Sequence, residues 1–189
     1  KAIRRQRQMC IRDRFYVPHD VYGLAKLMGG KKPFIDKLQM VFDEGLYDPA
    51  NEPDIAYAHL FSYFKGEEWR TQKETQRLLD KYFTTKPDGI PGNDDTGTMS
   101  SWAIFNMIGF YPDCPGLPEY TLTTPVFNKV TIRLDPKWYK ENELVIETNR
   151  TQPGTLYIDK VLLDGKKFNK YHITHDELVH GKYLKFDLK

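Results

Sequence analysis

The sequence has few features that would place it in a membrane or stabilise it by disulfides. Its 189 residues contain no apolar run of about 18 residues, so no transmembrane helix is expected. Only two cysteines occur, Cys10 and Cys114, and they form neither a disulfide framework nor a zinc-binding spacing. The start of the chain also lacks the apolar segment of a signal peptide. The chain is long enough to bury a core as one domain or two small ones.

The charge distribution gives little support for nucleic-acid binding. The net charge is +2, but residues 1–14 hold six basic residues against one acidic residue, so the remainder is net acidic. No basic stripe occurs elsewhere, and we expect no nucleic-acid partner. Residues 1–14 also lack a hydrophobic period and differ in character from the rest of the chain. We expect them to be a non-native or disordered segment.

Hydrophobic periodicity predicts helices in the first half of the chain. Apolar residues recur at helical spacing in five stretches, 21–28, 34–42, 55–64, 67–82 and 98–107. Asp54 is expected to cap the third of these helices. Short serial helices with brief connections are typical of antiparallel helical hairpins, as in a bundle or an α/α toroid.

From Pro112 onward the pattern changes to strands. Prolines and a glycine interrupt the chain at 112–118, and strand-like runs come next at 120–123, 129–134, 143–148, 155–163 and 183–188. Asp164-Gly165 predicts a tight hairpin turn, and residues 176–180 suit a short turn or helix. The expected fold class is therefore α+β: a partial α/α toroid over residues 15–111, followed by an antiparallel β unit over 112–189.

Three polar clusters lie on loops that lead into predicted helices, where catalytic groups are often found. They are Val17-Pro-His-Asp20, Asn51-Glu-Pro-Asp54 and Asn93-Asp-Asp95. Each also has a purely structural explanation. The first suits a helix N-cap, the second a turn followed by a cap, and the third an exposed loop.

The third cluster places two carboxylates, Asp94 and Asp95, side by side on a glycine-rich loop. Adjacent carboxylates repel, so the pattern favours a bound cation, a substrate or a solvated turn. Asn, Glu and Asp oxygens suit calcium, but their order does not fit an EF-hand loop, so any calcium site would combine separate loops. Paired carboxylates also suit inverting glycoside hydrolysis, in which one group donates a proton and the other activates water.

Four motifs occur in order along the chain: Phe-Tyr-Val-Pro-His-Asp-Val from Phe15, Asn-Glu-Pro-Asp-Ile-Ala-Tyr from Asn51, Gly-Ile-Pro-Gly-Asn-Asp-Asp-Thr-Gly-Thr-Met-Ser-Ser-Trp from Gly89, and Ile-Gly-Phe-Tyr-Pro from Ile108. Together they resemble glycoside hydrolase family 92, the calcium-dependent exo-acting α-mannosidases. The resemblance extends from Phe15 to the C-terminus.

The resemblance implies an N-terminal β-sandwich and a C-terminal α/α toroid with the active site between them, and this chain resembles the C-terminal part. It implies inverting hydrolysis of terminal α-linked mannose, commonly α-1,2, on an oligosaccharide or a glycoprotein glycan. It also implies a calcium ion that binds vicinal sugar hydroxyls, a missing β-sandwich domain as partner, and a secreted or periplasmic location.

The motifs also imply roles for individual residues. The resemblance assigns Asp95 as the catalytic base, with Asp94 as the alternative. It assigns calcium binding to Asn51 and Glu52, and substrate binding or support of the active-site wall to His19, Asp20 and Asn93.

One departure from the family pattern bears on activity. The family's general acid lies in a Glu-Gly motif about a dozen residues before Val-Pro-His-Asp, which falls here near Arg7, and the first glutamate of the chain is Glu44. We therefore expect the parent protein to be an enzyme and this chain alone to be inactive. The alternative is a non-catalytic carbohydrate-binding or structural module that holds sugar through Trp69, Trp102 or Tyr111. For Trp102, core packing is favoured over sugar stacking.

Overall fold

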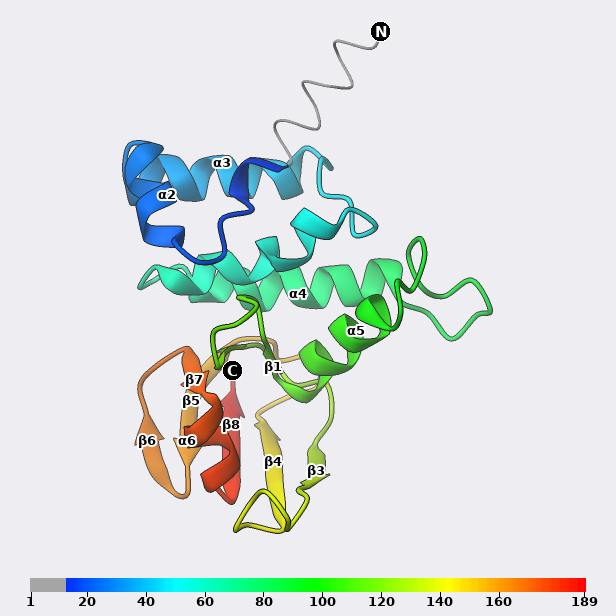
Figure 1. Ribbon diagram of the computed structural model, residues 1–189, viewed down its shortest axis with the longest axis vertical. Helices are drawn as coiled ribbons and strands as arrows, with labels where there is room; N and C mark the ends of the chain where they lie inside the picture. The colour runs from blue at the N-terminus through cyan, green and yellow to red at the C-terminus, as the bar shows by residue number, and fades with distance from the viewer. Residues whose placement is uncertain (1–12) are drawn as a thin grey trace, which may run out of the picture.

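The computed structural model describes residues 13–189, which form a helical layer packed on a β-sheet layer (Figure 1). Residues 1–12, with most of the segment expected to be non-native, lie outside this range. The helical layer consists of η1 (Asp13–Phe15), α2 (Val21–Leu27), α3 (Lys31–Asp43), η2 (Glu52–Tyr63), α4 (Glu68–Tyr82) and α5 (Thr98–Ile108). In Figure 1, α5 lies between the other helices and the sheets.

The β layer contains two sheets and one short helix. The elements are β1 (Phe110–Tyr111), β2 (Glu119–Leu122), β3 (Lys129–Arg133), β4 (Glu143–Arg150), β5 (Ile158–Leu163), β6 (Lys166–Phe168), β7 (His172–Thr174), α6 (His175–His180) and β8 (Tyr183–Leu188). One sheet has the order β1-β2-β7 and the other β3-β4-β8-β5-β6. The predicted α+β fold class is confirmed, although β1 and β7, only two and three residues long, were not predicted.

One strand pair departs from the expected antiparallel arrangement. β4 and β8 pair in parallel, whereas all the other strand pairs within residues 13–189 are antiparallel. A parallel pair needs a connection of a dozen or more residues, and here β5, β6, β7 and α6 supply it. The predicted hairpin is confirmed, because Asp164 and Gly165 adopt φ values of 49° and 77° between β5 and β6.

The third predicted helix is a 3-10 helix rather than an α-helix, and Asp54 does not cap it. η2 begins at Glu52, and Asn51 occupies the N-cap position. The Asp54 side chain lies fully buried within the helix, where its carboxylate accepts hydrogen bonds from the backbone N–H of Asp48 and the side-chain amide of Asn51, both at 2.9 Å. Long 3-10 helices are uncommon because their hydrogen bonds are poorly aligned, so packing on α4 sustains this one.

The two layers have separate hydrophobic cores that share α5. Trp102 and Ala103 lie in the core of the helical layer, whereas Phe105 and Ile108 pack against the core of the β layer. Trp102 is 1% exposed and stacks on Phe83, with 5.4 Å between ring centroids, so the core role expected for it is confirmed. Because α5 faces both cores, the loop that precedes it is anchored to both layers.

Candidate active site

Asp94 holds the start of α5. Its carboxylate accepts hydrogen bonds from the backbone N–H and the hydroxyl of Ser100, both at 2.8 Å. Its carbonyl oxygen accepts from the backbone N–H groups of Gly97 and Met99. These contacts satisfy N–H groups that a helix N-terminus leaves unpaired. The Asp94 carboxylate is therefore fixed in place by hydrogen bonds to the first turn of α5.

Asp95 is held differently, although it is the next residue. It has a φ of 46°, and Thr96 follows with a φ of 60°, so two consecutive non-glycine residues adopt the left-handed conformation. This conformation is sparsely populated for such residues and clusters at functional sites. The Asp95 side chain is exposed, and within residues 13–189 its carboxylate accepts no hydrogen bond. The loop therefore presents one anchored and one unanchored carboxylate.

Gly92 brings this loop against the segment that precedes η2. Its φ is 68°, and a Cβ added at this position would lie 2.7 Å from the Cβ of Ala50. The loop of Asn93 to Asp95 and the turn of Asn51 and Glu52 are thus neighbours in space, although some 40 residues separate them. The structure therefore brings two of the three predicted clusters together.

A small cleft of about 150 Å³ lies where these loops meet the helices. Glu52 and Thr98 line it, together with Tyr16, Tyr111 and Asp113. Carboxylate and hydroxyl groups around a cleft of this size can hydrogen-bond to the hydroxyls of a small polar ligand.

Asp113 is a candidate that the motifs did not identify. Its side chain is only 5% exposed, Oδ1 accepts a hydrogen bond from the Thr121 hydroxyl at 2.8 Å, and Oδ2 has no partner within residues 13–189. Burial, followed by the Asp113 charge, raises the pKa of the Tyr111 hydroxyl. Its position in the sequence could have identified it as a candidate, since Asp113 directly follows the Ile-Gly-Phe-Tyr-Pro motif.

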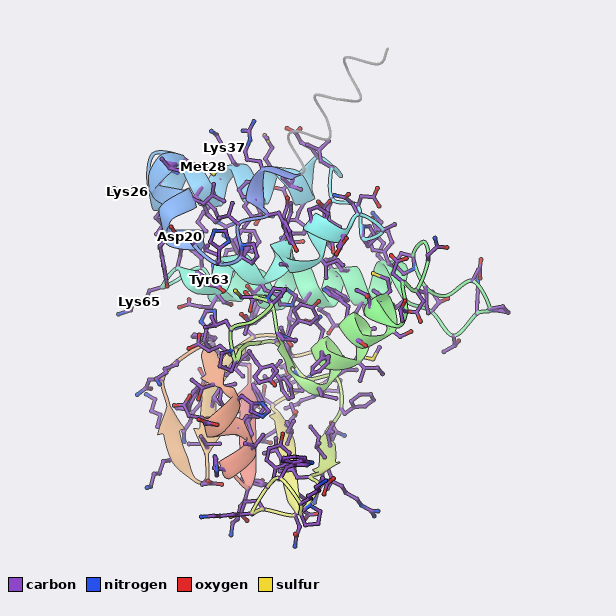
Figure 2. All side chains as sticks on the ribbon, in the orientation of Figure 1. Asp20, Lys26, Met28, Lys37, Tyr63 and Lys65 are labelled. Carbon is purple, nitrogen blue, oxygen red and sulfur yellow. The ribbon has the colours of Figure 1, made fainter. Side chains whose placement is uncertain are left out.

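The first predicted cluster directly follows Tyr16, which lines this cleft, but none of its own side chains is among the lining residues. The Asp20 carboxylate accepts a hydrogen bond from the backbone N–H of Gly23 at 2.8 Å and caps α2, as its structural explanation requires. The hydroxyl of Tyr22 donates to the carbonyl of Tyr63 at 2.9 Å, so Asp20 lies near the end of η2, and Figure 2 shows Asp20 and Tyr63 on the same side of the molecule. At about 2.0 Å per residue, that end is roughly 20 Å from Glu52. His19 is exposed on the same loop.

Asn51 and Glu52 offer the right donor chemistry for calcium but only part of a shell. Calcium takes six to eight oxygen ligands, and amide and carboxylate oxygens are suitable. Within residues 13–189 no three His, Cys, Asp or Glu side chains are grouped closely enough to hold a metal ion. The residues present therefore fit a calcium site that further oxygen donors complete.

A buried histidine lies on the inner side of the cleft wall. His59 is fully buried, its Nε2 lies 2.9 Å from Oδ1 of Asn106, and its ring stacks on Tyr111 at 4.4 Å. Burial lowers the pKa of His59, outweighing the Asp113 charge, which raises it. Burial likewise lowers the pKa of His172, whose Nε2 has no partner in the described part of the chain. Burial thus favours the neutral form of the His59 imidazole that packs behind Tyr111 of the cleft wall.

The sequence matches a known family over nearly its whole length. Residues 9–189 match the glycosyl hydrolase family 92 catalytic domain. The chain belongs to glycoside hydrolase family 92. A secreted glycosidase from Arthroderma benhamiae, itself uncharacterized, is 30% identical to this family 92 chain over 176 residues, which is 93% of the chain and 22% of that protein.

Solved structures agree with the family assignment. A family 92 α-mannosidase from Bacteroides thetaiotaomicron, also solved with mannoimidazole, superposes with a TM-score of 0.86 at 32% identity, over 95% of this chain and 24% of its own. An inverting family 92 mannosidase from Bacteroides thetaiotaomicron VPI-5482 gives a TM-score of 0.82 at 30% identity, over 95% and 27%. The family 92 chain thus spans about a quarter of the length of these relatives.

Within the described part of the family 92 chain, no helix is both long and apolar enough to cross a membrane. What the comparisons show for this chain is its family. The structure adds the placement of the carboxylates, which family membership alone does not give.

Proposed function

We propose that this chain is the C-terminal part of an exo-acting, inverting, calcium-dependent α-mannosidase. The proposed substrate is terminal α-linked mannose, α-1,2 in particular, on an oligosaccharide or a glycoprotein glycan. Its family membership and its likeness to structures named as mannosidases support this substrate class. A secreted or periplasmic location is part of the proposal, supported by the relative described as secreted.

The observation that carries the mechanism is the contrast between Asp94 and Asp95. A catalytic base must approach water freely, and Asp95 is exposed with no hydrogen bond to its carboxylate from residues 13–189. The Asp94 carboxylate, in contrast, is engaged by two groups of Ser100 on α5. This contrast favours Asp95 as the base and Asp94 as the residue that positions the loop.

In the proposed reaction, Asp95 accepts a proton from a water molecule while the water oxygen attacks the anomeric carbon. The bond from that carbon to the glycosidic oxygen breaks, and a general acid donates a proton to the leaving oxygen. The general acid comes from the longer protein, outside residues 13–189. A positioned acid is typically worth about 10²–10⁴-fold in rate, so we expect the chain alone to release no measurable mannose.

Asn51 and Glu52 are proposed to contribute oxygens to the calcium site, which the rest of the longer protein, including an N-terminal β-sandwich, completes. When bound, calcium would supply positive charge that orients the sugar hydroxyls. Asn93 lies beside the carboxylates on the same exposed loop and is proposed to bind substrate. Asp113 and Glu52 line the cleft from its inner and outer sides, since one is buried and the other exposed.

The test uses the longer protein and its Asp95→Asn and Asp94→Asn variants. We expect Asp95→Asn to lower kcat by about 10²–10⁴-fold with little change in KM, because it removes the base and leaves the contacts to Ser100. We expect Asp94→Asn to lower kcat less and to reduce thermal stability as well. Proton NMR of the first product should show inversion at the anomeric carbon, and chelation by EDTA should abolish the activity.

Asp88→Asn is the matched control, because Asp88 is also exposed on the same connection between α4 and α5. It should leave kcat unchanged. A wild-type rate in the Asp95→Asn variant would show that Asp95 is not the base, and release of mannose with retained configuration would exclude the inverting mechanism.

A further inference from the structure

A second cleft lies at the opposite end of α4 from the Asp94–Asp95 loop. It has a volume of about 460 Å³, within the range of ligand pockets in proteins. Three aromatic residues line it, Trp69 from α4, Tyr157 before β5 and Tyr171 before β7. Glu68 and Lys189 also line it, where the Glu68 carboxylate accepts a hydrogen bond from the backbone N–H of Gly66 and the Lys189 ammonium is paired with Asp159, both at 2.7 Å. The cleft therefore combines ring surfaces with charged groups.

The rings are exposed rather than packed away in a core. Trp69 is 40% exposed and Tyr157 is 37% exposed, and their ring centroids lie 6.4 Å apart at an interplanar angle of 71°. The Arg70 guanidinium lies 4.6 Å from the Trp69 ring, but Arg70 is not among the residues that line the cleft. Arg70 thus covers one face of the indole, and the Trp69 side chain remains 40% exposed.

The polar ends of these aromatic side chains are unpaired within residues 13–189. Neither the indole N–H of Trp69 nor the hydroxyls of Tyr157 and Tyr171 make a hydrogen bond in this part of the chain. Tyr171 is half-buried, and burial, followed by the charge of Glu68, raises the pKa of its hydroxyl. These three polar ends face the cleft region without a protein partner, so they are open to hydrogen-bond to water or to a polar ligand.

The walls of the cleft are fixed by one contact between the two layers and by backbone pairs within the β layer. Oε1 of Gln72 accepts a hydrogen bond from the backbone N–H of Ile158 at 3.0 Å, and both groups are buried. Tyr157 and Lys189 pair through their backbones at 2.8 and 3.2 Å. The carbonyl of Tyr171 accepts from Leu122 N–H at 2.8 Å. A cleft with fixed walls binds without the entropic cost of ordering them.

This chemistry matches a pyranose ring. The C–H face of a sugar carries partial positive charge and stacks on the negative face of an aromatic ring, while its hydroxyls need donors and acceptors at the edge. Purely apolar ligands would leave the indole N–H and both tyrosine hydroxyls unpaired. A highly anionic ligand would gain little at the rim, because the Lys189 ammonium is already paired with Asp159.

We propose that this cleft is an accessory carbohydrate-binding site that takes a hexopyranose unit of a glycan. It is separate from the candidate active site, because α4 is 15 residues long, or roughly 20 Å at 1.5 Å per residue, and the loop of Asp94 and Asp95 follows its far end. The inference rests on the proposed function for the identity of the glycan. A weak second contact would hold a branched glycan near the active site and raise its effective concentration there.

The test is an NMR titration of the ¹⁵N-labelled 189-residue chain with α-1,2-linked mannobiose, into the range of tens of millimolar. The chain has three tryptophans, Trp69, Trp102 and Trp138, so three indole N–H signals report independently. We expect the Trp69 signal to shift saturably. Trp102 is buried and donates to the Ile55 carbonyl, and Trp138 is 72% exposed outside this cleft, so their signals should stay in place.

Variants distinguish binding at this site from nonspecific sugar binding and from catalysis. Tyr157→Ala should weaken binding by roughly tenfold while the Trp102 signal confirms the fold, and Trp138→Ala should leave binding unchanged. Asp95→Asn should also leave binding unchanged. The absence of a Trp69 shift, or an equal shift of Trp138, would overturn the accessory site. Failure of the longer protein to release mannose would overturn the proposed function instead and would leave the Trp69 shift intact.

Discussion

The helical layer and the five-stranded sheet fill their interiors with different chemistry, whereas the segment around β2 buries polar groups as well, among them Asp113, Thr121 and Thr123. The five-stranded sheet buries only apolar side chains along its central strands, among them Leu144, Ile146, Val161, Leu184, Phe186 and Leu188. The helical layer buries many polar ones, Asp54, His59, Ser62, Thr71, Gln72, Glu74, Thr75 and Asn106. A buried polar group needs a hydrogen-bond partner to avoid a large desolvation cost. An interior with many polar side chains therefore indicates a role in addition to stabilising the fold.

The difference indicates how the two layers divide their roles. The apolar core of the β layer supplies stability, and Phe105 and Ile108 of α5 pack against it. The polar helical layer positions loops: Asp54 fixes the turn before η2, and Asn106 holds His59 behind the cleft. We infer that stability is concentrated in the five-stranded sheet and chemistry in the helical layer together with the segment of Tyr111 and Asp113, and mutations in each part can test that division.

The largest effect is expected from opening the β core. Phe186→Ala should lower the free energy of unfolding by about 4 kcal/mol, since Phe186 is fully buried and its removal leaves a cavity. Because α5 faces both cores, Trp102 fluorescence should report the same shifted midpoint as far-UV circular dichroism.

Phe127→Ala is the control for that change, because Phe127 is 43% exposed and its loss should cost well under about 1 kcal/mol. If Trp102 kept the wild-type midpoint while the circular dichroism shifted, the two layers would unfold separately. The shared role of α5 would then be wrong.

The same division explains which parts of the fold the sequence could predict. β8 alternates outward and inward residues along its full length, and that period appears directly in the sequence. η2 has buried residues on all sides, including Asp54 and His59, so its sequence lacks the period that would distinguish a 3-10 helix from an α-helix. The buried polar residues of η2 thus remove the hydrophobic period from which the helix type would be predicted.

The candidate site was predicted in part for a related reason. The carboxylates of Asp94 and Asp95 stand out because two like charges on a glycine-rich loop are unusual. The contact of Gly92 with Ala50 could not be predicted, because nothing local in either segment encodes it. Asp113 was missed because a single aspartate after a proline suits an ordinary turn, and only burial distinguishes it.

The next largest effect tests the contact that brings the two site loops together. Gly92→Ala should destabilise the fold by about 2 kcal/mol, because the residue has a positive φ and its new Cβ would approach Ala50 at 2.7 Å. Urea unfolding measures the change. In the longer protein, kcat should fall as well, since the loop of Asp95 must move away from Glu52.

Gly45→Ala isolates the backbone part of this cost, because Gly45 has a similar φ of 65° and no atom within 4 Å of a new Cβ. It should cost about 1 kcal/mol. The double variant Ala50→Gly with Gly92→Ala should recover the difference. Equal costs for both single variants would mean that the two loops are not in contact in solution.

A smaller effect should appear in the pH dependence of stability. Burial lowers the pKa of His59 and of His172 in the folded state, so the unfolded chain binds protons first as the pH falls below about 6.5. Stability is therefore complete above that pH and declines below it, by about 1 kcal/mol between about pH 7 and pH 5.5. Urea unfolding across this range should show the decline.

His59→Gln should reduce that decline without abolishing it, because His172 in β7 also contributes, whereas His19→Asn should leave it in place, because His19 is exposed. A slope unaffected by His59→Gln would assign the pH dependence to groups outside the polar interior of the helical layer. The contrast between the layers would then have no consequence for stability near neutral pH.

The smallest effect concerns a helix cap in each layer. Asp20 caps α2, and Thr174 caps α6 in a reciprocal arrangement with Glu177. Asp20→Ala and Thr174→Ala should each cost about 1 kcal/mol by thermal unfolding, and Asp20→Ser should recover most of the first loss because serine also caps well.

Only Asp20 lies in the layer that carries the chemistry, so activity distinguishes the two. In the longer protein, Asp20→Ser should keep both stability and kcat if the residue is a cap alone. A stable Asp20→Ser variant with a raised KM would instead show that this carboxylate reaches the substrate, even though it lies toward the far end of η2 from Glu52.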